Sequence, residues 1–257
     1  PLDFLSTLHS KDFLPSSGFI FFPFFFFVFF PASFLRGQAH DEPPADPTQM
    51  PLLHQGVRSR SADPRPPALL FHARFPVIKT LEQFRWDWPK KINRLQVQNL
   101  FRLEFLAQKA NVVLLGNVGL WKTHLAIALG YAACQEGYSV LFADAISVIN
   151  DLAAAQKRGL LKRQLKKYLA PELLLLDELG YLPIDQHGAD LLFQVISQRY
   201  ERGSIVLTTN KPFKQWAAIF NHDSTIASAV LDRLLHHAET VVIEGSSYRM
   251  KDQVNPQ

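Results

Sequence analysis

Residues 111–123 read Asn111-Val-Val-Leu-Leu-Gly116-Asn-Val-Gly119-Leu-Trp121-Lys122-Thr123. A short apolar run ends in glycine, a loop follows, and a Lys-Thr pair opens the Ala- and Leu-rich stretch 122–136. This order predicts a buried strand, a loop and a helix. In such a setting the backbone N–H groups and the helix N-terminus surround phosphates, the lysine neutralises the terminal phosphates and the threonine ligates magnesium. The predicted nucleotide-binding residues are Gly116, Asn117, Val118, Gly119, Leu120, Trp121, Lys122 and Thr123.

One residue departs from the full pattern of such loops, which is Gly, four residues, then Gly-Lys-Ser or Gly-Lys-Thr. Trp121 stands where the pattern has its second glycine. Glycine at this point lets the backbone approach the phosphates and adopt angles that other residues resist. We therefore expect the indole to crowd the nucleotide or distort the loop, and so to impair nucleotide binding.

A second motif places two carboxylates after an apolar strand. Leu173-Leu-Leu-Leu176 runs directly into Asp177 and Glu178. Ligands bind at the carboxyl ends of strands in parallel sheets. Asp177 would hold magnesium together with Thr123, and Glu178 would polarise the attacking water. The alternative is structural, because acidic residues after a strand often cap the next helix.

Three further residues are candidates for contacts with the nucleotide. Asn210 ends the strand-like run 204–209, where an amide can orient water, although an Asn before Lys-Pro also favours a turn. Arg233 would stabilise phosphoryl-transfer charge in a neighbouring copy, unless it pairs with Asp232 or Glu239 at the surface. Arg249 would contact a phosphate in its own chain, or is simply a surface residue.

A basic stretch follows the helix predicted over 145–157. Its apolar residues, such as Leu161 and Leu165, fall on one face of a second helix at 160–169, and the opposite face gathers positive charge. Such a face grips a DNA backbone without reading sequence, or is a solvated helix surface. The predicted DNA-binding residues are Lys157, Arg158, Lys162, Arg163, Lys166 and Lys167.

The other elements alternate between strands and helices. We predict a helical segment over 90–110, helices at 122–136 and 187–201 and, besides the strands already named, strands at 139–143 and 240–243. This alternation, with continuously apolar strands, predicts an α/β fold in which helices cover both faces of a parallel sheet.

The first 70 residues differ from the rest. They hold 12 of the 21 Phe and 11 of the 17 Pro residues and carry a net charge of −1, against +5 for 71–257. The uncharged tract Gly18–Leu35 has the length of a minimal membrane span, but two prolines interrupt it, and a Pro-, Asp-, Arg- and Ser-rich segment follows at 38–69. We interpret 1–70 as a disordered or non-native extension, with a membrane or signal element as the alternative.

The composition excludes classes of protein that depend on several cysteines. The 257 residues contain one cysteine, Cys134, which rules out a disulfide framework and a four-thiolate zinc site and favours a reducing, cytoplasmic setting. Cys134 falls on an apolar helix face and is expected in the core. The pair His236-His237 has no matching ligand set in the sequence, so we interpret both as surface or packing residues. The net charge of +4 permits contact with nucleic acid without requiring it.

Together these motifs resemble one family. Residues 75–251 are similar to the IstB-like transposition helper ATPases of the AAA+ class, which are related to DnaC-type helicase loaders. The similarity rests on segments 79–84, 122–130, 176–183, 199–203, 207–210, 231–237 and 247–249.

This resemblance implies an AAA+ type P-loop NTPase domain over 71–251, with a small helical N-terminal element near 80–110 and a tail at 252–257. It implies ATP and Mg²⁺ as cofactors. It implies double-stranded DNA, a cognate transposase and further copies of the chain as partners, and no membrane. Glu178, Asn210 and Arg233 take catalytic positions, and Arg249 that of a second sensor. The rival functions are a non-hydrolysing DNA-binding scaffold, a helicase loader, and a membrane-tethered ATPase that uses the Phe-rich tract.

Overall fold

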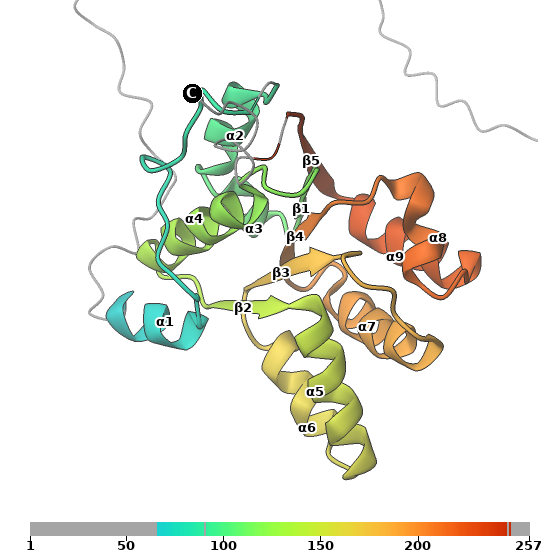
Figure 1. The fold of residues 1–257 in the computed structure, drawn as a ribbon. Helices are drawn as coiled ribbons and strands as arrows, with labels where there is room; N and C mark the ends of the chain where they lie inside the picture. Colours follow the sequence, from blue (N-terminus) through green and yellow to red (C-terminus); the bar gives the residue numbers. More distant parts are fainter. Residues whose placement is uncertain (1–65, 90, 246, 248–257) are drawn as a thin grey trace, which may run out of the picture. The chain divides into compact units, whose positions relative to one another are not determined.

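The computed structural model describes residues 66–89, 91–245 and 247. Within these residues five strands form one parallel sheet in the order β2-β3-β4-β1-β5 (Figure 1). The strands are β1 (Asn111–Gly116), β2 (Val140–Asp144), β3 (Leu173–Leu179), β4 (Ser204–Thr209) and β5 (Ala238–Ile243). The predicted α/β fold with a parallel sheet is therefore confirmed.

Helices cover both faces of the sheet (Figure 1). One face carries α1 (Pro66–Ala73), α2 (Arg94–Leu100), α3 (Glu104–Ala107) and α4 (Lys122–Gln135). The other carries α5 (Ala145–Lys157), α6 (Leu161–Leu169), α7 (Gln186–Arg199), α8 (Trp216–Ile219) and α9 (Ser224–Leu235). A short 3₁₀ helix, η1 (Phe213–Gln215), precedes α8.

Alternate residues of the strands supply the two cores. Val112 and Leu114 of β1 pack with the first group of helices, while Val113 packs with the second. All three side chains are fully buried. The apolar runs of the sequence therefore reflect burial on both faces, as expected for a parallel sheet.

Aspartates determine where two of the longer helices begin. Asp144 accepts a hydrogen bond from the Ser147 N–H at 2.9 Å and caps α5, and Asp185 accepts from the Gly188 N–H at 2.8 Å and caps α7. Each satisfies a backbone donor that the first turn of a helix leaves unpaired. The cap of α7 is thus Asp185, so the alternative interpretation of Asp177 and Glu178 as helix caps is wrong.

The helical segment predicted over 90–110 is two short helices, α2 and α3. Leu103, between them, has a left-handed backbone with φ of 59°. Leu103 and Phe105 are both buried. Two residues apart on a continuous helix they would point to nearly opposite sides, and the break allows both to reach the core.

Two further differences concern helix positions. The helix α1 spans the boundary placed at residue 70, because Leu69 and Leu70 pack against the core on the α4 side. No element was expected between 210 and 239, where η1, α8 and α9 lie. In α9 the buried Ala227, Val230 and Leu234 follow helical spacing.

A buried arginine joins elements at the amino-terminal edge of the sheet. Arg199 is 2% exposed, and burial lowers the pKa of its guanidinium to about 10, so it remains charged at neutral pH. It donates hydrogen bonds of 2.8–3.1 Å to the backbone carbonyls of Tyr168, Pro171, Glu172 and Ser204. One side chain therefore connects the end of α6 to the starts of β3 and β4.

Candidate nucleotide-binding site

The predicted phosphate loop connects the carboxyl end of β1 to the start of α4. Its glycines lie where there is no room for a side chain. A Cβ on Gly116 would collide with the Ile243 carbonyl, and a Cβ on Gly119 would collide with the Ser247 hydroxyl. Gly119 also has a positive φ of 77°. Lys122 donates from Nζ to the Asn117 carbonyl at 2.8 Å, so its ammonium lies over the loop.

Trp121 is the first residue before α4 and takes a left-handed conformation, with φ of 62°. Glycine adopts this region without steric cost, whereas other residues resist it. The indole lies edge-on to the rings of Phe84, at 6.3 Å, and His124, at 5.1 Å. The loop therefore keeps its strand–loop–helix form with tryptophan at the glycine position.

The two carboxylates that follow the apolar run of β3 lie in different environments, one buried and one exposed. Asp177 is 6% exposed, and its Oδ1 accepts hydrogen bonds from the Thr123 hydroxyl at 3.0 Å and the Thr208 hydroxyl at 2.5 Å. Glu178 is exposed at the cavity described below, where β3 bulges and the Glu178 φ is 61°. Thr208 also accepts the Glu178 N–H at 3.0 Å, so this one hydroxyl orients both acidic residues.

Burial raises the pKa of Asp177 above its usual range, and the nearby Asp144 carboxylate adds to this effect. The hydroxyls of Thr208 and Thr123 and the charge of Lys122 act in the opposite direction. Burial disfavours the charged form of a carboxyl, while hydrogen bonds and a nearby cation favour it. A bound cation would also favour the ionised form of Asp177.

Lys122, Thr123, Glu178 and Thr208 line a cavity of about 320 Å³. Its walls come from three places: the loop with the start of α4, the carboxyl ends of β3 and β4, and the segment 76–79. The lining residues are Pro76, Val77, Lys79, Val118, Gly119, Leu120, Trp121, Lys122, Thr123, His124, Ile127, Glu178, Tyr181, Thr208, Thr209 and Asn210. Its size falls within the range of small-molecule sites.

His124 holds the segment 76–80 against α4. It is 6% exposed, and one of its ring nitrogens, Nε2, lies 2.9 Å from the Thr80 carbonyl oxygen. Burial lowers the pKa of His124, so the ring is neutral at pH 7. Sequence reasoning missed both His124 and Thr208, although each stands inside a motif it used, Lys-Thr-His and Thr-Thr-Asn.

The remaining predicted nucleotide contacts differ in position. Asn210 lines the cavity, and its side-chain oxygen is buried without a hydrogen-bond partner. Arg233 lies on α9, away from the residues that line the cavity, where it donates to the Ala229 carbonyl and stacks over Phe193 at 4.9 Å. Arg249 lies outside the described residues, but Ser247, two positions earlier, lies against Gly119 of the loop.

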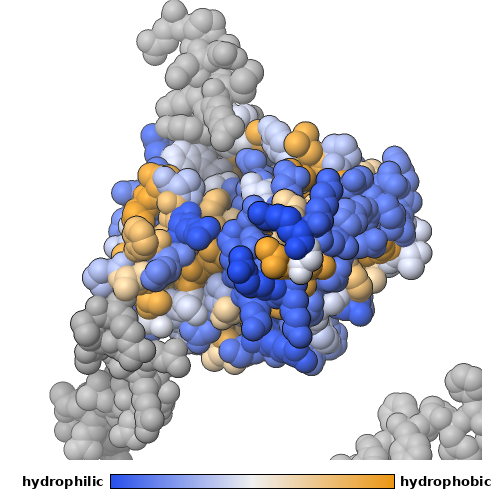
Figure 2. Space-filling model, turned by 90° about the horizontal axis from the view of Figure 1, so that it is seen from below, coloured by the Kyte–Doolittle hydropathy of each residue, from blue (hydrophilic) through white to orange (hydrophobic). Residues whose placement is uncertain are grey.

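The predicted DNA-binding residues project from the α5–α6 hairpin. Five of the six are exposed: Lys157, Arg158, Lys162, Arg163 and Lys166. Lys167 is half-buried and pairs with Asp151 at 2.7 Å. Figure 2 views the molecule from the end to which α5 and α6 extend, and hydrophilic side chains gather there.

Two further predictions concern Cys134 and a membrane-spanning helix. Cys134 is fully buried in α4, and burial raises the pKa of its thiol to about 12, so it is a core residue as predicted. Among the described residues no helix is long and apolar enough to cross a membrane. The Phe-rich tract Gly18–Leu35 lies outside the described residues.

The parallel sheet, the phosphate loop and the acidic pair after β3 define a P-loop NTPase domain of the AAA+ type. The profile of the IstB-like ATP-binding proteins matches residues 50–256. The chain belongs to this family.

Curated relatives agree with this assignment. The chain is 45% identical over 184 residues to an insertion sequence IS21 putative ATP-binding protein of Pseudomonas aeruginosa, covering 72% of this chain and 69% of that protein. It is 43% identical over 178 residues to the corresponding IS232 protein of Bacillus thuringiensis subsp. berliner, covering 69% and 71%.

Solved structures share the fold. The DnaC helicase loader aligns with a TM-score of 0.52 at 22% identity, over 64% of this chain and 96% of that chain. AMPPCP-bound DnaA from Aquifex aeolicus aligns with a TM-score of 0.52 at 26% identity, over 67% of this chain and 52% of that chain. The chain thus spans about half the length of that DnaA.

Proposed function

We propose that this chain is an ATP-dependent, DNA-binding helper of a transposase, and that Trp121 weakens its nucleotide site. The observation that carries the proposal is the network in which Thr123 and Thr208 both donate to the buried Asp177 beside the phosphate loop. Insertion sequence ATP-binding proteins are its relatives, which supports a role in transposition.

The residues of the site fit ATP with magnesium. Mg²⁺ prefers oxygen ligands, and Thr123 and Asp177 offer a hydroxyl and a carboxylate 3.0 Å apart. These two residues would hold the ion, which would supply positive charge to the phosphates. Lys122 and the N–H groups at the start of α4 would bind the phosphates. Glu178 would accept a proton from water, and Asn210 would orient that water.

Trp121 lowers nucleotide affinity for two reasons. Its left-handed backbone is strained for a residue with a Cβ, and its side chain lines the cavity beside Lys122. The packing of the indole against Phe84 and His124 offsets part of this cost.

The position of Arg233 supports an oligomer. It lies on α9 and does not line the cavity of its own chain, so as a phosphate contact it would act in the site of another copy. Arg249 would contact a phosphate within its own chain, which the position of Ser247 against the loop supports.

The five exposed basic residues of the α5–α6 hairpin bind the backbone of double-stranded DNA in this proposal. Contacts to phosphates position a protein without reading bases and release counterions, so the affinity falls as salt rises. Lys167 contributes less because it already pairs with Asp151.

The deciding experiment compares the full chain with Trp121→Gly for binding of a fluorescent ATP analogue with Mg²⁺ and for ATP hydrolysis with and without DNA. We expect tighter binding and faster hydrolysis for the variant. If only the variant binds nucleotide, the natural chain is a non-hydrolysing scaffold. Equal binding by both would overturn the proposed weakening by Trp121, and binding by neither would overturn the nucleotide site.

DNA and transposase binding need separate tests. The double substitution Lys162→Ala/Arg163→Ala should reduce the slope of log affinity against log salt by about 2, while Arg102→Ala, which removes an exposed charge elsewhere, should not change it. An unchanged slope would remove the hairpin from the DNA interface. Co-purification with the transposase of the same insertion sequence, against a replicative helicase, separates the transposition role from that of a helicase loader.

A further inference from the structure

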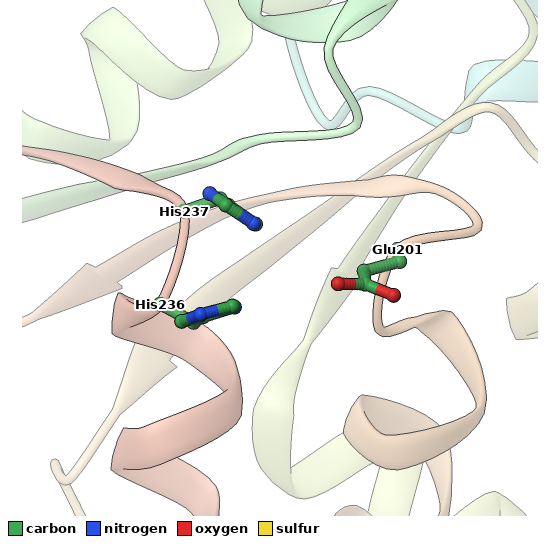
Figure 3. Close-up of side chains that lie close together, drawn as sticks. All are labelled: Glu201, His236 and His237. Carbon is green, nitrogen blue, oxygen red and sulfur yellow. The ribbon is translucent and has the colours of Figure 1, made fainter. Parts of the chain in front are cut away.

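A group of metal-ligand side chains lies at the amino-terminal edge of the sheet. Among the described residues, Glu201, His236 and His237 place one ligand atom each within 4.8 Å of one another. Figure 3 shows the two imidazole rings near each other and a carboxylate oxygen of Glu201 directed toward them. All three residues are exposed. They come from two segments, the turn between α7 and β4 and the link between α9 and β5.

Buried hydrogen bonds hold these two segments together. The Asn111 side chain donates to the Leu234 carbonyl at 3.0 Å and accepts the Ile205 N–H at 2.9 Å. The Asn111 N–H donates to the His237 carbonyl at 2.7 Å. Asn111 is 8% exposed, so a buried residue holds the His237 backbone and joins the end of α9 to the start of β4, four residues after Glu201. The fold therefore brings the two ligand-bearing segments together.

A neighbouring hydroxyl orients one of the imidazoles. Tyr200 Oη lies 2.6 Å from His236 Nδ1. Histidines that bind metals usually donate their second ring N–H to such a partner, which sets the tautomer and the direction of the ring. If Nδ1–H of His236 donates to the Tyr200 hydroxyl, Nε2 is the nitrogen left to bind a metal.

Charges of both signs lie around the cluster. Glu201 supplies a negative charge and the cluster follows the C-terminus of α9, where the helix dipole is negative, while Arg233 in the last turn of α9 is positive. Two imidazoles and one carboxylate form a donor set that binds zinc with one position left for water. Harder cations such as Mg²⁺ prefer oxygen ligands.

We propose that Glu201, His236 and His237 bind one Zn²⁺ ion, with water as the remaining ligand. The ion joins the end of α9 to the α7–β4 turn. The nucleotide loop follows the opposite end of the six-residue strand β1, about 20 Å away at the rise of a strand. The zinc site is thus separate from the nucleotide site and does not depend on the proposed function.

The test uses the full chain, freed of metal by a chelator, and titrates Zn²⁺ by calorimetry and Co²⁺ by its visible absorption. We expect one equivalent of Zn²⁺ whose affinity falls at least about tenfold in His237→Ala and in Glu201→Gln. The matched control is His222→Ala, which removes an exposed histidine elsewhere and should leave the affinity unchanged. Because the substituted residues are exposed, each variant should keep the circular dichroism of the parent.

Two further measurements distinguish a specific zinc site from non-specific zinc binding. Tyr200→Phe should weaken Zn²⁺ binding by about tenfold, because the imidazole of His236 loses its orienting partner. Zinc at 100 times the dissociation constant of the parent should raise the melting temperature of the parent by roughly 5–10 °C, and that of a ligand variant with tenfold weaker binding by about half as much. Equal zinc affinity in the parent, His237→Ala and Glu201→Gln would overturn the proposal, as would an equal loss in His222→Ala.

Discussion

The two edges of the sheet carry clusters that were assembled in different ways. At the carboxyl edge, Thr123 at the start of α4, Asp177 in β3 and Thr208 in β4 meet through hydrogen bonds of 2.5–3.0 Å. At the amino edge, Glu201, His236 and His237 are exposed, and a buried network behind them sets their positions.

The two clusters differ in whether they can be recognised from the sequence. Thr123 and Asp177 belong to motifs whose spacing follows from phosphate chemistry, so both can be recognised locally, whereas Thr208 was missed. The amino-edge residues follow no such spacing, and their proximity depends on the path of the chain between α7 and β5. Substitutions at the two edges should therefore have separable effects. At the carboxyl edge they should change nucleotide binding, and at the amino edge they should change the stability of the protein.

The largest effect is expected at the amino edge, from Arg199→Met. This change removes the charged group that satisfies four backbone carbonyls and should lower the free energy of unfolding by about 3–5 kcal/mol. The matched control Arg202→Met removes an exposed arginine three residues away and should cost less than about 0.5 kcal/mol. Denaturant unfolding measures both, and equal losses would contradict the role given to Arg199.

At the carboxyl edge, Lys122→Ala should act on function instead. In the Trp121→Gly background it should weaken ATP binding by about 100-fold, because the phosphates lose a charged hydrogen-bond donor. The exposed Lys109→Ala serves as control. Zinc affinity should not change in either variant. If Lys122→Ala altered zinc binding as strongly as nucleotide binding, the two edges would not be independent.

Asp144 tests whether every carboxylate at that edge serves the nucleotide. Asp144→Ala should cost about 1 kcal/mol of stability through loss of the α5 cap, while nucleotide affinity stays within about twofold. Asp144→Asn retains an acceptor for the Ser147 N–H and should preserve most of the stability. Loss of nucleotide binding in both variants would place Asp144 in the site.

The smallest expected effect on stability is an increase, from Asp177→Asn. Because burial raises the pKa of Asp177, its ionised form is disfavoured in the folded state. This penalty is absent below the unfolded pKa and grows as pH rises through the folded pKa. Asp177→Asn should therefore raise the melting temperature at neutral pH, with a gain that fades on acidification, and should abolish magnesium-dependent nucleotide binding. A lower melting temperature at pH 7 would show that the two hydroxyls outweigh burial.

The fold was largely predictable from the sequence, and so were many of the residues that line the candidate nucleotide site. Continuous apolar runs located β1, β3 and β4, because a strand buried on both faces has no polar alternation. The loop and Asp177 were recognised from motifs that phosphate and metal chemistry require. The prediction of one helical segment over 90–110 was wrong. Leu103 and Phe105 are both buried in the same core, and the backbone breaks at Leu103 to allow this.

Tertiary structure alone decided which distant side chains meet. The role of Thr208 depends on β3 and β4 being neighbours, and the cluster of Glu201 with His236 and His237 depends on Asn111 holding two chain segments together. Local sequence determines the period of burial and the chemistry of a loop, since both act over a few residues. Which elements lie side by side is set by packing over the whole sheet, and no short stretch of the chain contains that information.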